Sequence, residues 1–218
     1  MIKGTDCLLV MGRRGCGKSY LAKRLQELWP RKVIFDSLHE YQDECERANS
    51  FLEFCEIIAR LKSASPDRFT LVVNFDIESE HSQSEFDQML RLCYYYGNIQ
   101  VIIEEVQNFS SPHNLPHWLK NCLLTGRHQN LSLLFTTQRP GELNKTILSQ
   151  CSHIFCGSLI EGNDLRYISA FLRQDSQRLV QLPEREFLYF SSEGIKQITN
   201  DFKTVELAQD IDTTEETE

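Results

Sequence analysis

The stretch that decides the fold is Gly12-Arg13-Arg14-Gly15-Cys16-Gly17-Lys18-Ser19, which matches the phosphate-binding loop pattern G-x-x-x-x-G-K-[ST] at every fixed position. The apolar run Cys7–Met11 precedes it and a helical pattern over residues 20–25 follows it. This strand–loop–helix order is the context in which the pattern binds phosphate. The glycines let the backbone fold around a polyphosphate with its N–H groups pointing inward. The sequence therefore predicts that the chain binds a nucleoside triphosphate.

Two side chains of this loop have defined tasks in phosphate chemistry. In proteins with this pattern the lysine reaches the β- and γ-phosphates, and the Ser or Thr hydroxyl holds Mg²⁺. We therefore expect ATP and Mg²⁺ as cofactors, with Lys18 on the phosphates and Ser19 on the metal. The residues expected to contact the nucleotide are Gly12, Arg13, Arg14, Gly15, Cys16, Gly17, Lys18, Ser19 and Tyr20.

The composition is that of an ordinary globular protein. The 218 residues suffice for one α/β domain, and 41% of them are hydrophobic and 25% charged. No apolar run approaches the ~20 residues that a membrane-spanning helix needs, and the first residues lack the anatomy of a signal peptide. We therefore expect no membrane span and a cytoplasmic location.

The net charge of −8 is concentrated at the end of the chain. Residues 201–218 contain seven acids and one base, so residues 1–200 carry a net charge of only −2. A nearly neutral core is not typical of a protein that coats nucleic acid, but it is compatible with a local basic strip inside a ring channel. We interpret residues 1–200 as one domain and residues 201–218 as an acidic, disordered tail.

Eight cysteines are present, but none of them form a C-x-x-C pair. A zinc site or a disulfide framework is therefore not expected, and unpatterned thiols fit a reducing compartment. Cys16 lies inside the phosphate loop, so we expect bound ATP to shield its thiol from alkylation.

Short apolar runs alternate with helical patterns, which predicts a parallel sheet covered by helices. Helices are expected to begin after the capping boxes Ser50/Glu53 and Ser82/Glu85, and a third is expected to end near Gly126. The end of the domain predicts an antiparallel hairpin over residues 186–198. The strand candidates are residues 6–11, 32–36, 69–75, 99–104, 131–136 and 153–156.

Two acidic strand ends compete as the metal-side carboxylate. Residues 71–76 end in Asp76 alone, whereas residues 99–105 end in the pair Glu104 and Glu105. Two adjacent acids can divide the work, Glu104 toward the metal shell and Glu105 toward the attacking water. The pair favours an ATP hydrolase over an ordinary acidic strand end. Asp76 would fit a small-molecule kinase, which also needs an arginine-rich lid that does not follow the fourth strand.

Polar residues flank the buried strand expected at residues 131–136. Gln138 follows it at the edge that carries the phosphate loop, where it is expected to sense the γ-phosphate or orient water. Arg127 precedes it, at the opposite end, so it points away from its own phosphate loop. We expect Arg127 either to serve a neighbouring subunit or to be a surface arginine.

These motifs together resemble the FtsK–HerA superfamily of DNA-pumping ATPases. The resemblance rests on the phosphate loop, the Glu104-Glu105 pair, Gly126-Arg127-His128-Gln129-Asn130 before a strand and Thr136-Thr137-Gln138-Arg139-Pro140 after it, and it covers roughly residues 5–200. It implies an α/β, RecA-like P-loop NTPase domain with strand order 5-1-4-3-2. It also implies a ring hexamer with ATP sites between subunits.

The resemblance also implies roles for single residues. Lys18 and Ser19 are then the ligands of nucleotide and Mg²⁺, Glu104 the metal-side acid and Glu105 the catalytic glutamate. Gln138 is the sensor, and Arg127 is an arginine finger that acts on the neighbouring subunit. The superfamily usually has Asp-Glu where this chain has Glu-Glu, so Glu104 is the point of departure.

The chain is little more than the motor core of that superfamily. In size and layout it is similar to the genome-packaging ATPases of tailless, internal-membrane-containing double-stranded DNA viruses. This implies a location in the host cytoplasm or with the virion, and as partners double-stranded DNA, further copies of the chain, and capsid or portal-vertex proteins. The alternatives are a cellular HerA-like motor for DNA processing or conjugation, a slow nucleotide-gated scaffold, and a small-molecule kinase.

Overall fold

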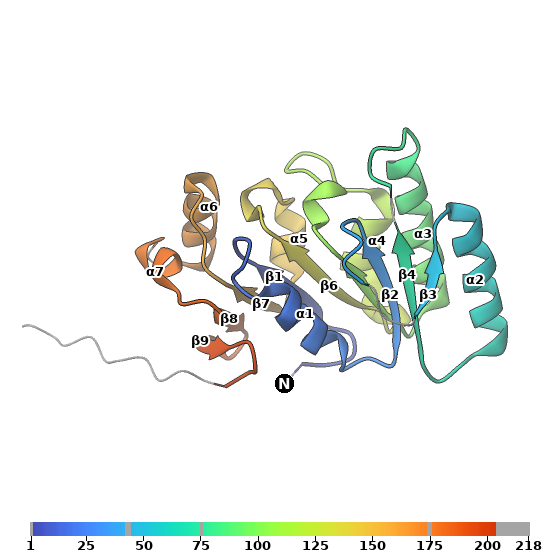
Figure 1. The fold of residues 1–218 in the computed structure, drawn as a ribbon, viewed down its shortest axis with the longest axis horizontal. Helices are drawn as coiled ribbons and strands as arrows, with labels where there is room; N and C mark the ends of the chain where they lie inside the picture. The colour runs from blue at the N-terminus through green and yellow to red at the C-terminus, as the bar shows by residue number, and fades with distance from the viewer. Residues whose placement is uncertain (1, 42–44, 75, 174–175, 204–218) are drawn as a thin grey trace, which may run out of the picture.

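The computed structural model describes residues 2–41, 45–74, 76–173 and 176–203 (Figure 1). The acidic tail expected from the sequence falls largely on residues 204–218 and so lies outside the described residues. In chain order the elements are β1 (Cys7–Met11), α1 (Lys18–Gln26), β2 (Arg31–Asp36), β3 (Glu46–Ala48), α2 (Phe51–Ala64), β4 (Phe69–Asn74), α3 (Ser82–Tyr96), β5 (Gln100–Ile103), η1 (Val106–Asn108), α4 (His117–Thr125), η2 (Gly126–Gln129), β6 (Ser132–Thr137), η3 (Pro140–Glu142), α5 (Lys145–Gln150), β7 (His153–Cys156), α6 (Gly162–Leu172), α7 (Ser176–Gln181), β8 (Glu186–Ser191) and β9 (Gly194–Thr199).

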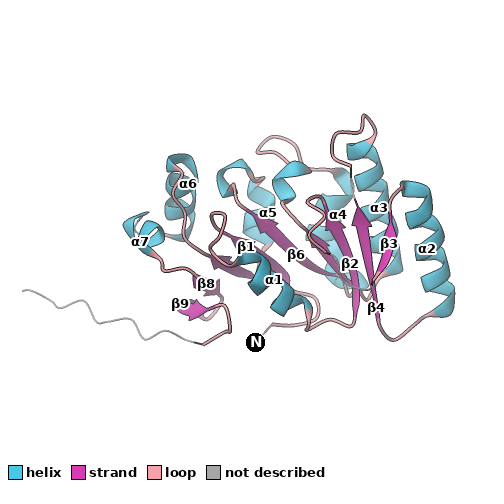
Figure 2. Ribbon diagram, viewed as in Figure 1, coloured by secondary structure: helices cyan, strands magenta, loops and turns pink. Residues whose placement is uncertain are grey.

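The strands of the described residues form one sheet in the order β3-β4-β2-β5-β6-β1-β7-β8-β9 (Figure 2). Neighbouring strands from β3 to β7 are parallel, whereas β8 is antiparallel to both β7 and β9. The inner part β7-β1-β6-β5-β2 is the order 5-1-4-3-2 implied by the resemblance, which confirms the RecA-like fold. β4, which was predicted at residues 69–75, extends this sheet beyond β2. The short β3, which was not predicted, pairs with β4 at the edge.

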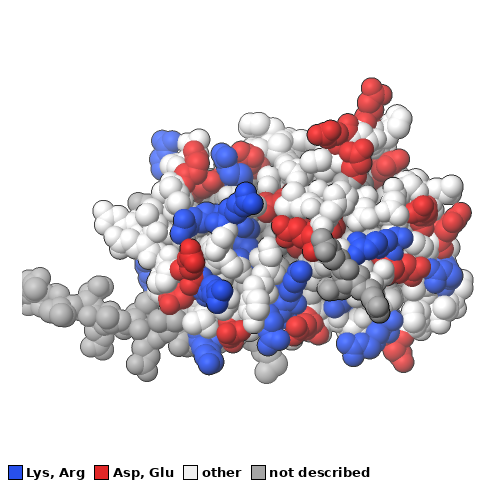
Figure 3. All heavy atoms as spheres, viewed as in Figure 1, with Lys and Arg blue, Asp and Glu red and all other residues white. Residues whose placement is uncertain are grey.

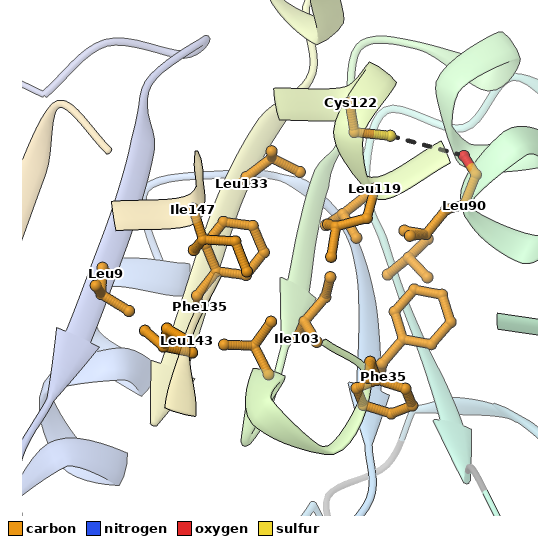
Figure 4. Packing of buried hydrophobic residues seen from close by; sticks show 14 of the residues in the cluster. Leu9, Phe35, Leu90, Ile103, Leu119, Cys122, Leu133, Phe135, Leu143 and Ile147 are labelled. Atoms are coloured by element: carbon orange, nitrogen blue, oxygen red, sulfur yellow. Dashed lines mark hydrogen bonds between the residues drawn. The ribbon is translucent and has the colours of Figure 1, made fainter. Parts of the chain in front are cut away.

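Helices cover both faces of the sheet because side chains that alternate along each strand are buried on both sides. On one face Phe35 of β2 and Ile103 of β5 pack with Leu119 of α4 and Ile147 of α5 (Figure 4). Residues of α2, α3 and α6 belong to the same core cluster. The opposite face packs against α1, for example through Leu21. Among the described helices, α1 therefore packs on one face of the sheet, and α2, α3, α4, α5 and α6 pack on the opposite face.

The capping box predicted at the start of α2 is present in a modified form. The Ser50 hydroxyl accepts the Glu53 N–H at 3.2 Å, as expected. The Glu53 carboxylate, however, accepts the backbone N–H of Asn49 at 2.7 Å rather than that of Ser50. Both ends of the box still satisfy N–H groups that the first helical turn leaves without partners.

The capping box predicted at the start of α3 is wrong, although the helix begins at Ser82 and ends before Gly97 as expected. The residue at the cap position is His81, and its side chain makes no capping hydrogen bond. The Ser82 hydroxyl instead donates to the carbonyl of Ile77 at 3.3 Å. The Ser82 hydroxyl is therefore bonded to the preceding turn and does not cap the helix.

The predicted hairpin over residues 186–198 is confirmed as β8 and β9. The helices α5, α6 and α7, which connect the last parallel strands and the hairpin, were not predicted from the sequence. Among the described residues, no helix combines the length and the apolar character that crossing a membrane requires.

Candidate active site

The phosphate loop lies between β1 and α1 with its backbone open toward the carboxyl edge of the sheet. The Gly12 N–H donates to the Thr137 carbonyl at 3.2 Å and the Arg13 N–H to the Ser158 carbonyl at 2.8 Å, which fixes the start of the loop between β6 and β7. Gly17 has φ +99°, a conformation that favours glycine, and it caps α1 without a side chain. The first N–H groups of α1 therefore have no side-chain cap and can bind an anion.

Lys18 and Ser19 occupy different positions relative to solvent. Lys18 is 7% exposed, and its Nζ donates to the Arg13 carbonyl at 3.4 Å, so its side chain crosses the loop. Ser19 is exposed, and its hydroxyl lies 3.4 Å from a carboxylate oxygen of Glu40. Both residues line the same cavity as the acidic pair. This placement suits the roles expected for them on phosphate and metal.

The position of Cys16 differs from the one expected from the sequence. The residue is 1% exposed and belongs to the core cluster beneath the loop, together with Phe155 and Phe187. Burial raises the pKa of the Cys16 thiol, an effect that the charge of Lys18 offsets in part. The expectation that bound ATP shields this thiol is wrong, because the protein core already covers it.

Glu104 follows β5 directly and is only 5% exposed. Its Oε1 accepts the Tyr41 hydroxyl at 2.8 Å and its Oε2 accepts the Thr136 hydroxyl at 2.9 Å. Burial raises the pKa of the Glu104 carboxyl, while these two hydrogen bonds lower it in part. A divalent cation beside the carboxylate would offset the remaining cost of burying its charge.

Glu105 is held by donors from two directions. It has φ +48° and is 6% exposed. Its carboxylate accepts the backbone N–H of Gln138 at 3.0 Å, the Gln138 side-chain amide at 2.9 Å and the Gln107 amide at 2.7 Å. The Gln138 side chain therefore hydrogen-bonds to Glu105, and this bond orients the Glu105 carboxylate. A role for Gln138 in sensing the γ-phosphate stays a prediction.

The loop after β2 supplies functional residues that the sequence reasoning missed. Asp36 is fully buried at the end of β2, and its carboxylate accepts the backbone N–H groups of Glu40 at 3.1 Å and Tyr41 at 3.0 Å. These bonds turn the loop back over the sheet, where the Tyr41 hydroxyl also accepts the side-chain amide of Gln26. The sequence signal for this loop was an aspartate at the end of a buried strand, because an aspartate carboxylate can accept hydrogen bonds from backbone N–H groups of the turn that follows.

A cavity of about 790 Å³ joins these groups at the carboxyl edge of the parallel strands. Its volume is in the range of small-ligand sites. One side of it carries the phosphate loop and the acidic pair, and the other carries Arg185, Asn200 and Asp201 at the foot of the hairpin, which the sequence did not predict.

No cluster of three or more His, Cys, Asp or Glu side chains suited to a metal occurs in the part of the chain that the structure describes. Mg²⁺ fits the cavity nonetheless, because it is usually held by one or two protein groups together with substrate phosphates. Ser19 and Glu104 are the groups that could hold it here.

Asp76 and Arg127 lie outside this cavity. Asp76 is exposed after β4, and β4 lies four strand spacings from β1, about 19 Å at ~4.8 Å per spacing. Arg127 is exposed in η2, at the amino end of β6, while the phosphate loop lies at the carboxyl edge. Asp76 therefore lies at the same edge as the nucleotide site but four strands away, whereas Arg127 lies at the opposite edge of the sheet.

On the face shown in Figure 3, basic and acidic side chains are interspersed among the described residues rather than divided into two regions. This agrees with the small net charge of residues 1–200.

Comparison with known proteins identifies relatives of the chain. A protein-family model described as an AAA domain matches residues 2–147, a span that contains the phosphate loop and the acidic pair. Protein P9 of Pseudoalteromonas phage PM2 is 25% identical over 197 residues, covering 86% of this chain and 86% of that protein.

Solved structures share the fold. The genome packaging NTPase B204 from Sulfolobus turreted icosahedral virus 2, in complex with AMPPCP, has a TM-score of 0.71 and 22% identity, covering 90% of this chain and 98% of that one. VirB4 of Thermoanaerobacter pseudethanolicus has a TM-score of 0.65 and 11% identity, covering 96% and 94%. At these identities the likeness concerns the fold. The fold that the resemblance implied is confirmed, and the chain shares it with a viral genome packaging NTPase.

Proposed function

The chain belongs to the AAA-domain family, whose model covers residues 2–147, and on this premise we propose that it hydrolyses ATP to move double-stranded DNA during viral genome packaging. The observation that carries the proposal is the meeting of the phosphate loop, Glu104, Glu105 and Gln138 around one cavity. The fold shared with B204, which is described as a genome packaging NTPase, supports the packaging step.

The proposed hydrolysis assigns one task to each group. Lys18 binds the β- and γ-phosphates, and Ser19 and Glu104 hold Mg²⁺, which neutralises charge on the phosphates when bound. Glu105, oriented by Gln138, accepts a proton from the water whose oxygen attacks the γ-phosphorus. The bond from the γ-phosphorus to the bridging oxygen breaks, and ADP and inorganic phosphate leave.

The proposed working unit is a ring of identical subunits, most simply a hexamer. Arg127 lies at the opposite edge of the sheet from the phosphate loop, so in the proposal it reaches the nucleotide of a neighbouring subunit. Such an arginine stabilises charge that develops on the transferred phosphoryl group and is typically worth ~10³–10⁵ in rate. In the proposal, double-stranded DNA passes through the ring. Capsid or portal-vertex proteins are the proposed docking partners.

The test is phosphate release by the full chain with and without double-stranded DNA. We expect DNA to raise turnover, Lys18→Ala to abolish hydrolysis, and Glu105→Gln to bind ATP without turning it over. Glu56→Gln, an exposed change on α2, is the matched control and should behave like the wild type. Absence of hydrolysis in the presence of DNA would support the slow scaffold instead and overturn the proposal.

Packaging itself is tested in the genome that encodes the chain. Introducing Lys18→Ala there should give particles that assemble but lack DNA. The likeness to VirB4, from a bacterium, supports the alternative of a cellular HerA-like motor, and DNA-filled particles in this experiment would favour it. The kinase alternative loses support because Asp76 lies outside the cavity.

A further inference from the structure

The foot of the C-terminal hairpin lies at the same edge of the sheet as the phosphate loop. Since β8 is antiparallel to β7 and β9 is antiparallel to β8, the start of β8 and the end of β9 both reach the carboxyl edge of the parallel strands. Arg185 precedes β8, and Asn200 and Asp201 follow β9. In Figure 1 the hairpin lies on one side of β1 and β6 lies on the other. β5 follows β6 in the strand order.

Hydrogen bonds fix this foot to the phosphate loop. The Arg185 N–H donates to the Cys16 carbonyl at 3.1 Å, and the Asn200 N–H donates to the Arg185 carbonyl at 2.8 Å. The Tyr20 hydroxyl donates to Asp201 Oδ1 at 2.9 Å. The foot is therefore held against both the loop and the first turn of α1.

The position of the acidic pair orients a nucleotide in the cavity. If the proposed function holds, the γ-phosphate lies beside Glu104 and Glu105, on the side of β5 and β6. The remainder of the molecule then extends from the phosphate loop toward β7, β8 and β9. The cavity of about 790 Å³ continues in that direction to Tyr20, Arg185 and Asn200.

We propose that Tyr20, Arg185, Asn200 and Asp201 form the subsite that recognises the nucleoside part of a bound nucleoside triphosphate. Tyr20 is 49% exposed and offers an aromatic face, and Arg185 offers a planar guanidinium, both suited to stacking on a base. This proposal rests on the proposed function, because it takes the direction of the phosphates from it.

Asn200 and Asp201 supply the hydrogen-bonding groups. Asn200 is only 8% exposed, and its carboxamide makes no hydrogen bond to another described residue. A carboxamide presents one acceptor and two donors, which complement the donor and acceptor pattern of adenine. The Asp201 carboxylate, held by Tyr20, can accept hydrogen bonds from ribose hydroxyls.

Comparing ATP with inorganic tripolyphosphate tests this subsite, because tripolyphosphate has the phosphates but no nucleoside. Calorimetry on the full chain with Mg²⁺ gives both dissociation constants. We expect the wild type to bind ATP more tightly than tripolyphosphate. Asn200→Ala should raise the dissociation constant for ATP about three- to tenfold, the range of one lost hydrogen bond. It should change the dissociation constant for tripolyphosphate by no more than about twofold. Tyr20→Ala, at a position that is 49% exposed, should act in the same way.

The matched control is Lys196→Ala, an exposed position of β9 outside the cavity, which should change neither constant. Equal weakening of ATP and tripolyphosphate, or no weakening of ATP in either variant, would overturn the subsite. Wild-type ATP binding no tighter than tripolyphosphate would overturn it as well. ATP binding with these losses but without hydrolysis would leave the subsite standing and remove only the proposed function.

Discussion

The hydroxyl of Tyr41 lies 2.8 Å from Oε1 of Glu104 and donates a hydrogen bond to it in the interior of the protein. Burial, followed by the charge of Glu104, raises the pKa of Tyr41 far above its ordinary value, so the hydroxyl keeps its proton and remains a donor. With Thr136 on the other oxygen, both ends of the carboxylate are held. The longer side chain of glutamate thus has partners where the superfamily usually has aspartate.

Removing the Tyr41 hydroxyl should slow turnover without weakening ATP binding. We expect Tyr41→Phe to lower kcat about ten- to hundredfold and leave the Kd for ATP within about twofold, since a hydrogen bond to a charged group contributes about 1.5–3 kcal/mol. The lost bond also lowers the pKa of Glu104 in the wild type. The acidic limb of the profile of rate against pH should therefore move to higher pH in the variant.

A double-mutant cycle separates positioning from general damage. Glu104→Asp shortens the side chain away from Tyr41, so Tyr41→Phe should cost much less in that background than in the wild type. Tyr96→Phe is the control, because it removes another buried hydroxyl, which donates to the Leu61 carbonyl at 3.3 Å. An unchanged kcat and an unchanged acidic limb in Tyr41→Phe would contradict the positioning role.

Burial of Glu104 should make the protein less stable as the pH rises. Because burial raises the pKa of this carboxyl in the folded protein, its contribution to stability is complete below the unfolded pKa of about 4.3 and is lost as the pH rises through the folded pKa. Glu104→Gln removes that loss. We expect it to raise Tm at pH 7.5 and to have little effect at pH 4, measured by calorimetry in EDTA. Equal shifts at both pH values, or a shift of the same size in the exposed Glu56→Gln, would count against this account.

The sequence was sufficient where a local pattern carries the information. The phosphate loop, the acidic pair after a buried strand and the C-terminal hairpin each depend on residues close together in the chain. Tyr41 and Glu104 are 63 positions apart, and Tyr20 and Asp201 are 181 positions apart. Such pairs become visible only when the strand order brings their loops to one edge. β3 was missed for another reason, because its three residues are too few to show a period.

A methyl group added at Gly157, beneath the phosphate loop, should destabilise the protein. A Cβ on Gly157 would lie 2.9 Å from the Cys16 sulfur and 3.0 Å from the Phe187 ring. We expect Gly157→Ala to lower the free energy of unfolding by about 1–3 kcal/mol, the usual cost of overpacking. Cys16→Ala should relieve part of this loss when combined with it, as urea titrations of both variants would show. Gly162→Ala, where nothing lies within 4 Å of the added Cβ, is the control. Equal losses in Gly157→Ala and Gly162→Ala would remove the packing argument.

Arg127 and the phosphate loop lie at opposite edges of the sheet. We therefore expect an Arg127 variant and a phosphate-loop variant, each inactive alone, to restore activity when they are mixed in one ring. Arg127→Ala should bind ATP normally but hydrolyse it at least about 10³-fold more slowly, because the charge on the transferred phosphoryl group loses its partner. Lys18→Ala should fail at its own site yet still present Arg127 to a neighbour. Mixed rings of the two variants should therefore recover part of the wild-type phosphate release. Arg60→Ala, an exposed arginine change on α2, should be fully active alone. Full activity of Arg127→Ala by itself, or mixtures no more active than their components, would show that the arginine does not act between subunits.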